Sequence, residues 1–135
     1  MATATFHEGF VSELIGRPAM VQRDGVLETV GKIADFVVEH PEDTFPRIDA
    51  IIVKTRYGEL AAPIAEVASL DTEGVVLTAP PKIVRPHNDE ALYLVEDLFD
   101  KQIVDVDGRK VVRINDIEVA RTGGALRVVA ADIGL

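Results

Sequence analysis

The chain has 135 residues, a formal net charge of −9 and no cysteine. Its length fits one domain or two very small ones, and without disulfides or thiolate metal sites its stability must rest on an apolar core. The negative charge argues against a nucleic-acid partner, because such binding needs clustered lysine and arginine. No segment approaches the roughly 18 apolar residues of a membrane span. We therefore expect neither nucleic-acid binding nor direct insertion into a membrane.

The first part of the chain predicts short strands separated by turns. Residues 1–9 are expected to form a flexible leader, and residues 12–15 a single helical turn that Ser12 caps. Glycine, proline and aspartate then separate a series of apolar runs. These runs predict strands at residues 18–22, 29–39, 47–55, 60–64 and 74–79, with a short helical turn at residues 65–70. Such a series is typical of a small antiparallel barrel, so the expected fold class is all-β.

Residues 80–91 interrupt this pattern with three prolines and several charged residues. They predict a linker, and the alternative is an irregular edge segment packed on the barrel. The strand pattern then restarts, with a helical turn at residues 94–99 and strands at residues 102–106, 111–120 and 126–132. The expected organisation is therefore a barrel domain at residues 10–79 and a related β half-unit at residues 92–135.

The two parts repeat each other. Residues 11–17 are echoed by residues 95–101, and residues 31–36 by residues 112–117. Repeats usually bury their faces against each other, so we expect the units to pack with pseudo-twofold symmetry. The repeat also places charges in equivalent mid-strand positions, where they either serve the structure or line a recognition groove. These equivalent pairs are Asp35 with Asp116 and Lys32 with Arg113.

The first unit resembles the PRC-barrel domains, small β-barrels similar to the cytoplasmic domain of the photosynthetic reaction-centre H subunit and to the C-terminal domain of a ribosome maturation factor. The resemblance is carried by residues 12–39, from SELIGRP to VGKIADFVVE, by the IDAIIV run at residues 48–53 and by PIAEVASLD at residues 63–71. In the second unit, residues 98–108 and 111–120 are similar to a narrower group that precedes domains of magnesium transporters, often with nucleotide-sensing CBS modules. The resemblance implies a barrel architecture and, by analogy, a regulatory setting.

The second copy departs from the first in one respect. It has a counterpart of the strand at residues 47–53 but none of residues 56–79. A unit without those strands exposes a sheet edge, which proteins usually pair or cover. We expect the second copy to close against the first, to receive strands from a partner chain, or to continue in a longer protein, and we expect self-association.

Few residues carry candidate chemistry. Asp105 and Asp107 share one side of a strand end and are candidate ligands for a hard cation such as Mg²⁺, and the alternative is a solvated strand face entering a turn. His7, His40 and His87 are not spaced as metal ligands, and neither Ser12 nor Ser69 lies in a nucleophile motif. We therefore predict no catalytic residue and no resident cofactor.

The expected function is that of a non-catalytic adaptor or regulatory module that binds protein. The resemblance implies a cytoplasmic location, a parent protein related to magnesium-transport machinery, and membrane association only through that parent or a partner. Expected partners are another protein, further domains of a longer chain, or a second copy in a homodimer. The alternatives are a ligand or divalent-cation sensor and, third, a ribosome-associated role.

Overall fold

The computed structural model describes residues 8–84, 90–99, 101–104, 108 and 111–134. Strands dominate these residues, and the expected all-β class is confirmed. The helical elements are short: α1 (Val11–Leu14), the 3-10 turn η1 (Ile64–Glu66) and the π turn η2 (Leu94–Leu98). In the described part of the chain, no helix has the length and apolar character needed to cross a membrane.

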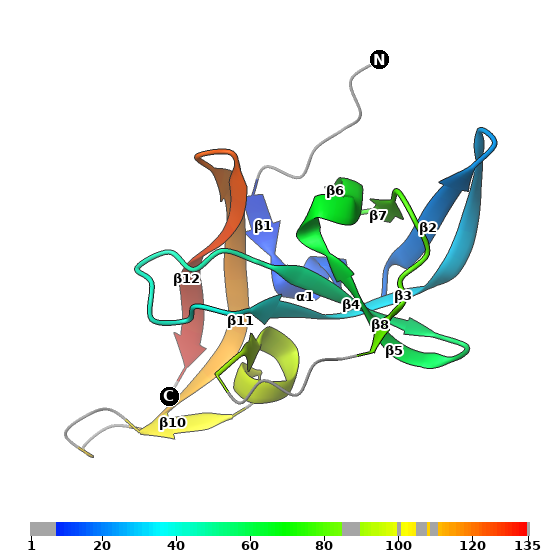
Figure 1. The fold of residues 1–135 in the computed structure, drawn as a ribbon. Coiled ribbons are helices and arrows are strands. Elements are labelled where there is room, and N and C mark those ends of the chain that lie inside the picture. Colours follow the sequence, from blue (N-terminus) through cyan, green and yellow to red (C-terminus); the bar gives the residue numbers. More distant parts are fainter. Residues whose placement is uncertain (1–7, 85–89, 100, 105–107, 109–110, 135) are drawn as a thin grey trace.

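The first unit forms most of an eight-stranded sheet (Figure 1). The spatial order is β6-β7-β2-β3-β4-β5-β8, and β9 pairs with the far end of β3. All pairs are antiparallel except that of β2 with β7. The end strands β6 and β8 are not paired with each other in the described ranges, so hydrogen bonding leaves the expected barrel open there. The strands are β2 (Pro18–Arg23), β3 (Val26–Val38), β4 (Ala50–Thr55), β5 (Gly58–Pro63), β6 (Val67–Asp71), β7 (Gly74–Leu77), β8 (Ile83–Val84) and β9 (Leu92–Tyr93).

Two differences from the sequence prediction lie in this sheet. Residues 67–70, expected to be helical, belong to strand β6. Ile83 and Val84, inside the expected linker, form β8 and pair with Ala61 and Leu60 of β5. For these two residues the structure matches the alternative of an edge segment packed on the first unit.

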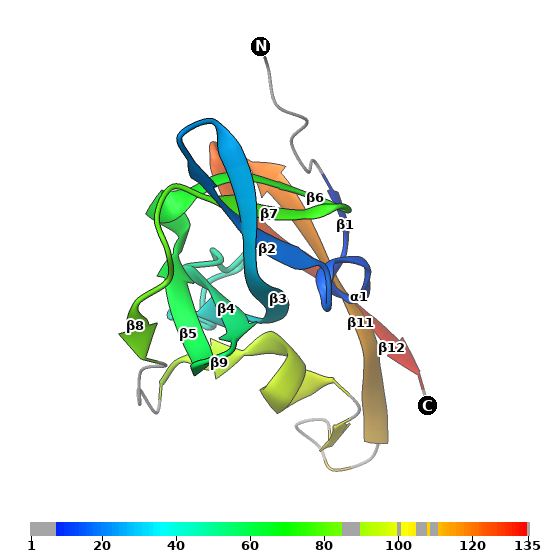
Figure 2. The same ribbon diagram turned by 90° about the vertical axis from the view of Figure 1, so that its right-hand side faces the viewer.

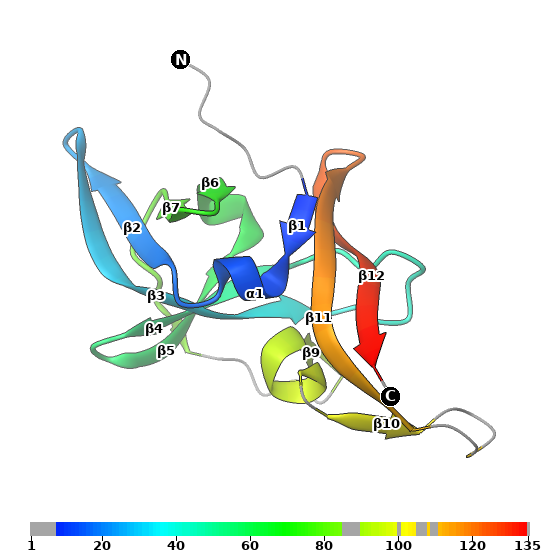
Figure 3. The same ribbon diagram turned by 180° about the vertical axis from the view of Figure 1, so that it is seen from behind.

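The second unit forms a four-stranded sheet around β11, the long strand seen beside the first sheet in Figures 1 and 3. One side of β11 pairs with β1 and β10, and the other side pairs with β12. A two-residue turn at Gly123-Gly124 joins β11 to β12. The strands are β1 (Glu8–Phe10), β10 (Gln102–Val104), β11 (Val111–Thr122) and β12 (Ala125–Gly134).

The two units exchange their leading strands. Strand β1, which precedes the helical turn of the first unit, pairs with β11 of the second, where Phe10 lies opposite Glu118. Strand β9, which precedes the helical turn of the second unit, pairs with β3 of the first, where Tyr93 lies opposite Val37. Figure 2 shows both helical turns between the two long strands. The exchange ties the units into one body.

Two aspartates complete this exchange by capping the helical turn of the opposite unit. Asp35 follows a β-bulge in β3 and accepts hydrogen bonds from the backbone N–H groups of Val95 (2.8 Å) and Glu96 (3.0 Å), at the start of η2. Asp116 follows the equivalent bulge in β11 and accepts hydrogen bonds from the backbone N–H (3.1 Å) and the hydroxyl of Ser12, at the start of α1. Each carboxylate thus satisfies N–H groups that a helix leaves without partners.

The prediction that Ser12 caps α1 is therefore wrong. Ser12 lies inside the turn as its second residue, and its hydroxyl donates to Asp116. The capping acceptor comes from a strand 104 residues further along the chain. Of the two interpretations of the paired aspartates, the structure supports the structural one.

One hydrophobic core runs through both units. It includes Leu14, Phe36 and Ile51 of the first unit together with Ile117 and Leu126 of the second, all at most 2% exposed. A smaller cluster of Val37, Ile52, Ala61 and Tyr93 covers the other face of the β3–β4–β5 region. Because the larger core draws on both units, each unit depends on the other for burial of its apolar face.

Candidate functional site

The sequence-based candidates do not form a site in the structure. Asp105 and Asp107 lie outside the described residues. Within the described ranges, no group of three or more histidine, cysteine, aspartate or glutamate side chains is placed to hold a metal ion. His40 lies on an exposed loop and pairs with Glu42 at 3.2 Å, while His7 and His87 fall outside the description.

The equivalent charged pairs do not line a groove. Asp35 is 5% exposed, and its carboxylate is committed to the cap described above. Lys32 is exposed and lies opposite Lys54 in the β3–β4 ladder, while Arg113 lies opposite Gln102 and Gly134. Neither Lys32 nor Arg113 therefore lies opposite an acidic residue in the described ladders.

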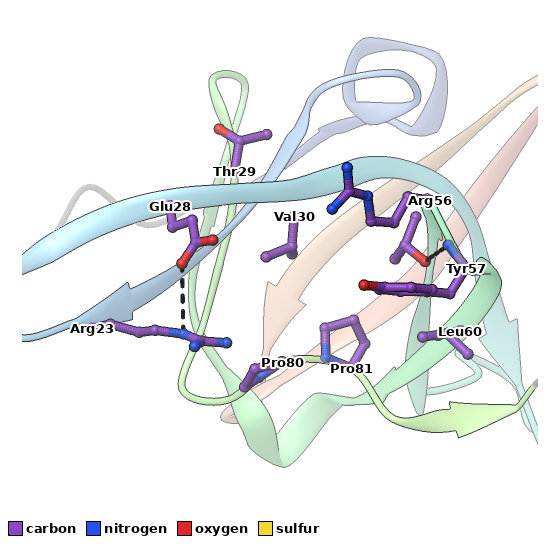
Figure 4. A pocket seen from close by; sticks show the side chains of 10 residues that line it. Arg23, Glu28, Thr29, Val30, Arg56, Tyr57, Leu60, Pro80 and Pro81 are labelled. Carbon is purple, nitrogen blue, oxygen red and sulfur yellow. Dashed lines mark hydrogen bonds and ion pairs between the residues drawn. The ribbon is translucent and has the colours of Figure 1, made fainter.

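An open groove of about 540 Å³ lies between the β2–β3 hairpin and the β4–β5 turn (Figure 4). We call it the Tyr57 groove. Three separate segments build it: the hairpin, the β4–β5 turn and the chain that follows β7. Its lining residues are Arg23, Glu28, Thr29, Val30, Thr55, Arg56, Tyr57, Leu60, Pro80 and Pro81.

Hydrogen bonds at the β4–β5 turn hold Tyr57 in position. Arg56 and Tyr57 are the two turn residues between the strands. The Thr55 hydroxyl donates to the carbonyl of Gly58 (2.9 Å) and accepts from the backbone N–H of Tyr57 (3.0 Å). Gly58 has a φ of +104°, a conformation that residues with a side chain rarely adopt. The turn therefore presents a large aromatic side chain where small polar residues are usual.

The groove offers apolar surface on several sides. Tyr57 is 81% exposed, and Figure 4 shows its ring between Arg56 and Pro81 with the hydroxyl directed into the groove. Val30 and Leu60 are half-buried, and Pro81 is buried as part of the floor. Other exposed apolar side chains are Val26 and Leu27 near the tip of the β2–β3 hairpin, and Ile83 and Val84 on β8.

The groove also carries two arginines in an otherwise acidic protein. Arg23 pairs with Glu28 across the β2–β3 hairpin at 3.7 Å. The Arg56 guanidinium lies 6.0 Å from the centre of the Tyr57 ring, at the limit of a cation–π contact. No carboxylate of the described residues lies within ion-pairing distance of Arg56. Arg56 is therefore free to pair with an anionic group of a ligand.

Sequence reasoning missed this groove because it read each segment separately. Residues 57–59 were expected to be a turn, and Pro80-Pro81 the start of a linker. One signal was present in the sequence: an arginine and a tyrosine occupy a two-residue turn, where their exposure brings no gain to folding.

Outside the groove, one carboxyl group shows a shifted titration. Hydrogen bonding to the backbone, and secondly to His40, lowers the pKa of the exposed Glu42 carboxyl below its usual range. The two side chains brace the loop between β3 and β4.

No protein-family model matches the chain, and no curated protein sequence matches it either.

Proposed function

We propose that the chain is a non-catalytic protein-interaction module that holds an extended acidic segment of a partner protein in the Tyr57 groove. The observation that carries this proposal is the position of Tyr57, which is 81% exposed and held over a groove of about 540 Å³. Exposed tyrosine and arginine side chains are enriched among the residues that dominate protein interfaces.

The chemistry of the groove favours this class of ligand. Arg56 supplies a cation with no carboxylate partner in the described part of the chain, so an aspartate or glutamate of the ligand gains a charge-assisted hydrogen bond there. Tyr57, Val30 and Leu60 supply apolar contacts for a neighbouring aliphatic side chain. The groove is open to solvent, which suits an extended peptide better than a small molecule that must be enclosed.

The resemblance to PRC-barrel domains agrees with an adaptor role and supplies a setting for it. That setting is a cytoplasmic module in a protein related to magnesium-transport machinery, and it rests on the resemblance alone. The proposed binding of an acidic segment is supported by the residues of the groove and does not depend on the identity of the parent protein.

A peptide titration tests the proposal. The probe is acetyl-Ser-Asp-Leu-Thr-Leu-Glu-Ser-amide, and its control replaces the two acidic residues with asparagine and glutamine. Binding to the isotope-labelled chain should shift the backbone NMR signals of residues 55–60 and 80–81. The uncharged control should bind about threefold more weakly or worse, because its amides keep an acceptor oxygen but lose the negative charge that attracts the Arg56 guanidinium.

Variants of the chain locate the binding. Arg56→Gln and Tyr57→Ala should each weaken binding about fivefold or more. Two exposed residues outside the groove provide matched controls, Arg121→Gln and Phe45→Ala, which should leave the affinity within about twofold. Equal losses in all four variants, or equal binding of both peptides, would contradict the proposal.

A further inference from the structure

The internal repeat allows the outer edge of β12 to be compared with the equivalent edge of β4. The register of the two sheets fixes the equivalence. Ile33 lies opposite Val53 as Ile114 lies opposite Ile133, and Phe36 lies opposite Ile51 as Ile117 lies opposite Ala131. Val53 of the first unit therefore corresponds to Ile133 of the second, and Ile51 corresponds to Ala131. By the same register Ile52 corresponds to Asp132.

The two units meet edge to edge at Arg47 and Arg127, which lie opposite each other in an antiparallel bridge. The backbone N–H of Ile48 donates to the carbonyl of Leu126 (2.9 Å), and the N–H of Val128 donates to the carbonyl of Pro46 (2.8 Å). The two bonds are equivalent, because the pseudo-twofold symmetry that relates the units converts one bond into the other. Beyond this point the two edges differ.

On the first unit, the edge continues into a full ladder with β5. Ile51 lies opposite Ala62 and Val53 opposite Leu60, and both Ile51 and Val53 are completely buried. On the second unit, no strand of the described residues pairs with β12 along this edge beyond Val128. Ile133 is consequently 55% exposed where its counterpart Val53 is 0% exposed. Among the described residues, the second unit therefore has no strand at the position that β5 occupies in the first unit.

We propose that this edge of β12 accepts an extended strand of a partner protein, added antiparallel as β5 is added to β4. Strand addition of this kind draws affinity from backbone hydrogen bonds and specificity from alternate side chains. The template of β5 indicates those side chains. An aliphatic residue faces Ile133 as Leu60 faces Val53, and a residue larger than Ala62 faces Ala131, since Ala131 replaces the bulkier Ile51.

Charge determines which residue of the incoming strand lies between the two that face Ile133 and Ala131. Asp132 takes the position of the buried Ile52 and is exposed, so a lysine or arginine of the incoming strand lies directly opposite a carboxylate. A second copy of the chain is disfavoured as the occupant. Pairing two β12 strands about Asp132 places two carboxylates opposite each other, in a protein that already carries a net charge of −9. The preferred partner segment therefore has an aliphatic residue, a basic residue and a second aliphatic residue in succession.

This inference does not depend on the Tyr57 groove, which lies on the opposite side of the molecule in Figure 1. It is tested with the peptide acetyl-Thr-Glu-Leu-Lys-Val-Thr-amide, whose leucine, lysine and valine face Ile133, Asp132 and Ala131. Added to the isotope-labelled chain, the peptide should shift the backbone NMR signals of residues 129–134 and protect their amides from hydrogen exchange. The signals of residues 55–60 in the groove should stay unchanged.

Two methylated peptides distinguish strand addition from apolar contact. In an antiparallel ladder, alternate residues direct their N–H groups toward the neighbouring strand. Methylation of one alternate set of backbone nitrogens should therefore weaken binding at least about tenfold, whereas methylation of the other set should change it less than about twofold. Equal effects of the two methylation patterns would overturn the proposal.

Variants of β12 provide the second test. Ile133→Lys places a charge on the apolar face of the edge and should weaken binding about tenfold, whereas Val84→Lys, at a position 73% exposed on β8, should not. Asp132→Asn changes only an exposed charge. It should weaken the lysine peptide about two- to fivefold and leave a peptide with norleucine in place of lysine unaffected.

Three results would contradict the proposal. The first is the absence of any shift at millimolar peptide, and the second is a shift confined to the groove. The third is a dimer in light scattering whose β12 amides are already protected without peptide, because it would assign the edge to a second copy.

Discussion

Replacement of Asp35 should destabilise the protein more than any other single change of a polar side chain in the described residues. The carboxylate is 5% exposed and accepts three backbone hydrogen bonds. Its Oδ1 accepts from Phe36 (2.7 Å) and Val95 (2.8 Å), and its Oδ2 accepts from Glu96 (3.0 Å). Asp35→Ala leaves these donors without their acceptor and removes a link between the two units.

The expected loss follows from the number and kind of these bonds. A hydrogen bond to a charged group contributes about 1.5–3 kcal/mol, and part of that gain is offset because burial of the carboxylate is itself costly. We expect Asp35→Ala to lower the free energy of unfolding by about 3 kcal/mol. Asp35→Asn retains one acceptor oxygen but turns an amide N–H₂ toward a backbone donor, so it should cost about half as much.

Asp116 provides the matched control. It occupies the equivalent position but is less buried, and it accepts from Ile117 (2.9 Å) and from the backbone N–H and hydroxyl of Ser12. Asp116→Ala should cost about 1 kcal/mol, the usual loss for a helix cap.

Urea unfolding followed by circular dichroism measures these differences from the transition midpoint at a constant slope. The reasoning is refuted if Asp35→Ala costs less than about 1 kcal/mol, or if Asp116→Ala costs more than Asp35→Ala.

Three further outcomes are expected. Gly31→Ala should cost about 1–3 kcal/mol in the same urea assay, because a Cβ at Gly31 would lie 2.3 Å from the carbonyl oxygen of Lys54; an unchanged midpoint would contradict this close approach. Tyr57→Ala should change the free energy of unfolding by less than about 0.5 kcal/mol, since the side chain is 81% exposed; a larger loss would show that Tyr57 serves the fold rather than a ligand. In an NMR titration, the Glu42 carboxyl should titrate below the usual glutamate range and move upward in His40→Ala; its stabilising effect is then present above the ordinary glutamate pKa and is lost as the pH falls through the lowered one.

Much of the fold was readable from the sequence because its signals are local. Turn formers such as Asp24-Gly25 mark hairpins, and Asp24 and Gly25 indeed adopt positive φ values of 50° and 78°. The segment at residues 65–70 was misread for an equally local reason. Ile64, Val67 and Leu70 recur every three residues, which imitates a helix, but a bulge between Val67 and Ser69 shifts the period of strand β6.

The reciprocal caps could be predicted only in part. The repeat shows that Asp35 and Asp116 are equivalent, and this equivalence is correct. Their hydrogen-bond partners cannot be predicted from the neighbouring sequence, because Asp35 accepts from the N–H of Val95, 60 residues away in the sequence. The Tyr57 groove was hidden for the same reason, since three separate segments form it.

The two proposals together assign the chain two separate binding surfaces, the Tyr57 groove for an acidic segment and the β12 edge for a strand with a central basic residue. Such a protein can hold two partners together without any change of its own fold. Linkage between the two sites is not required, because no described groove residue lies on β12.

The most direct test is a sequential titration of the isotope-labelled chain with both peptides. The acidic peptide is first added to saturation, and the lysine-containing strand peptide is then titrated into the complex. The account predicts shifts at residues 55–60 and at residues 129–134 together, with the second affinity within about twofold of its value in the absence of the first peptide. Displacement of one peptide by the other, or no shift at either surface, would contradict it.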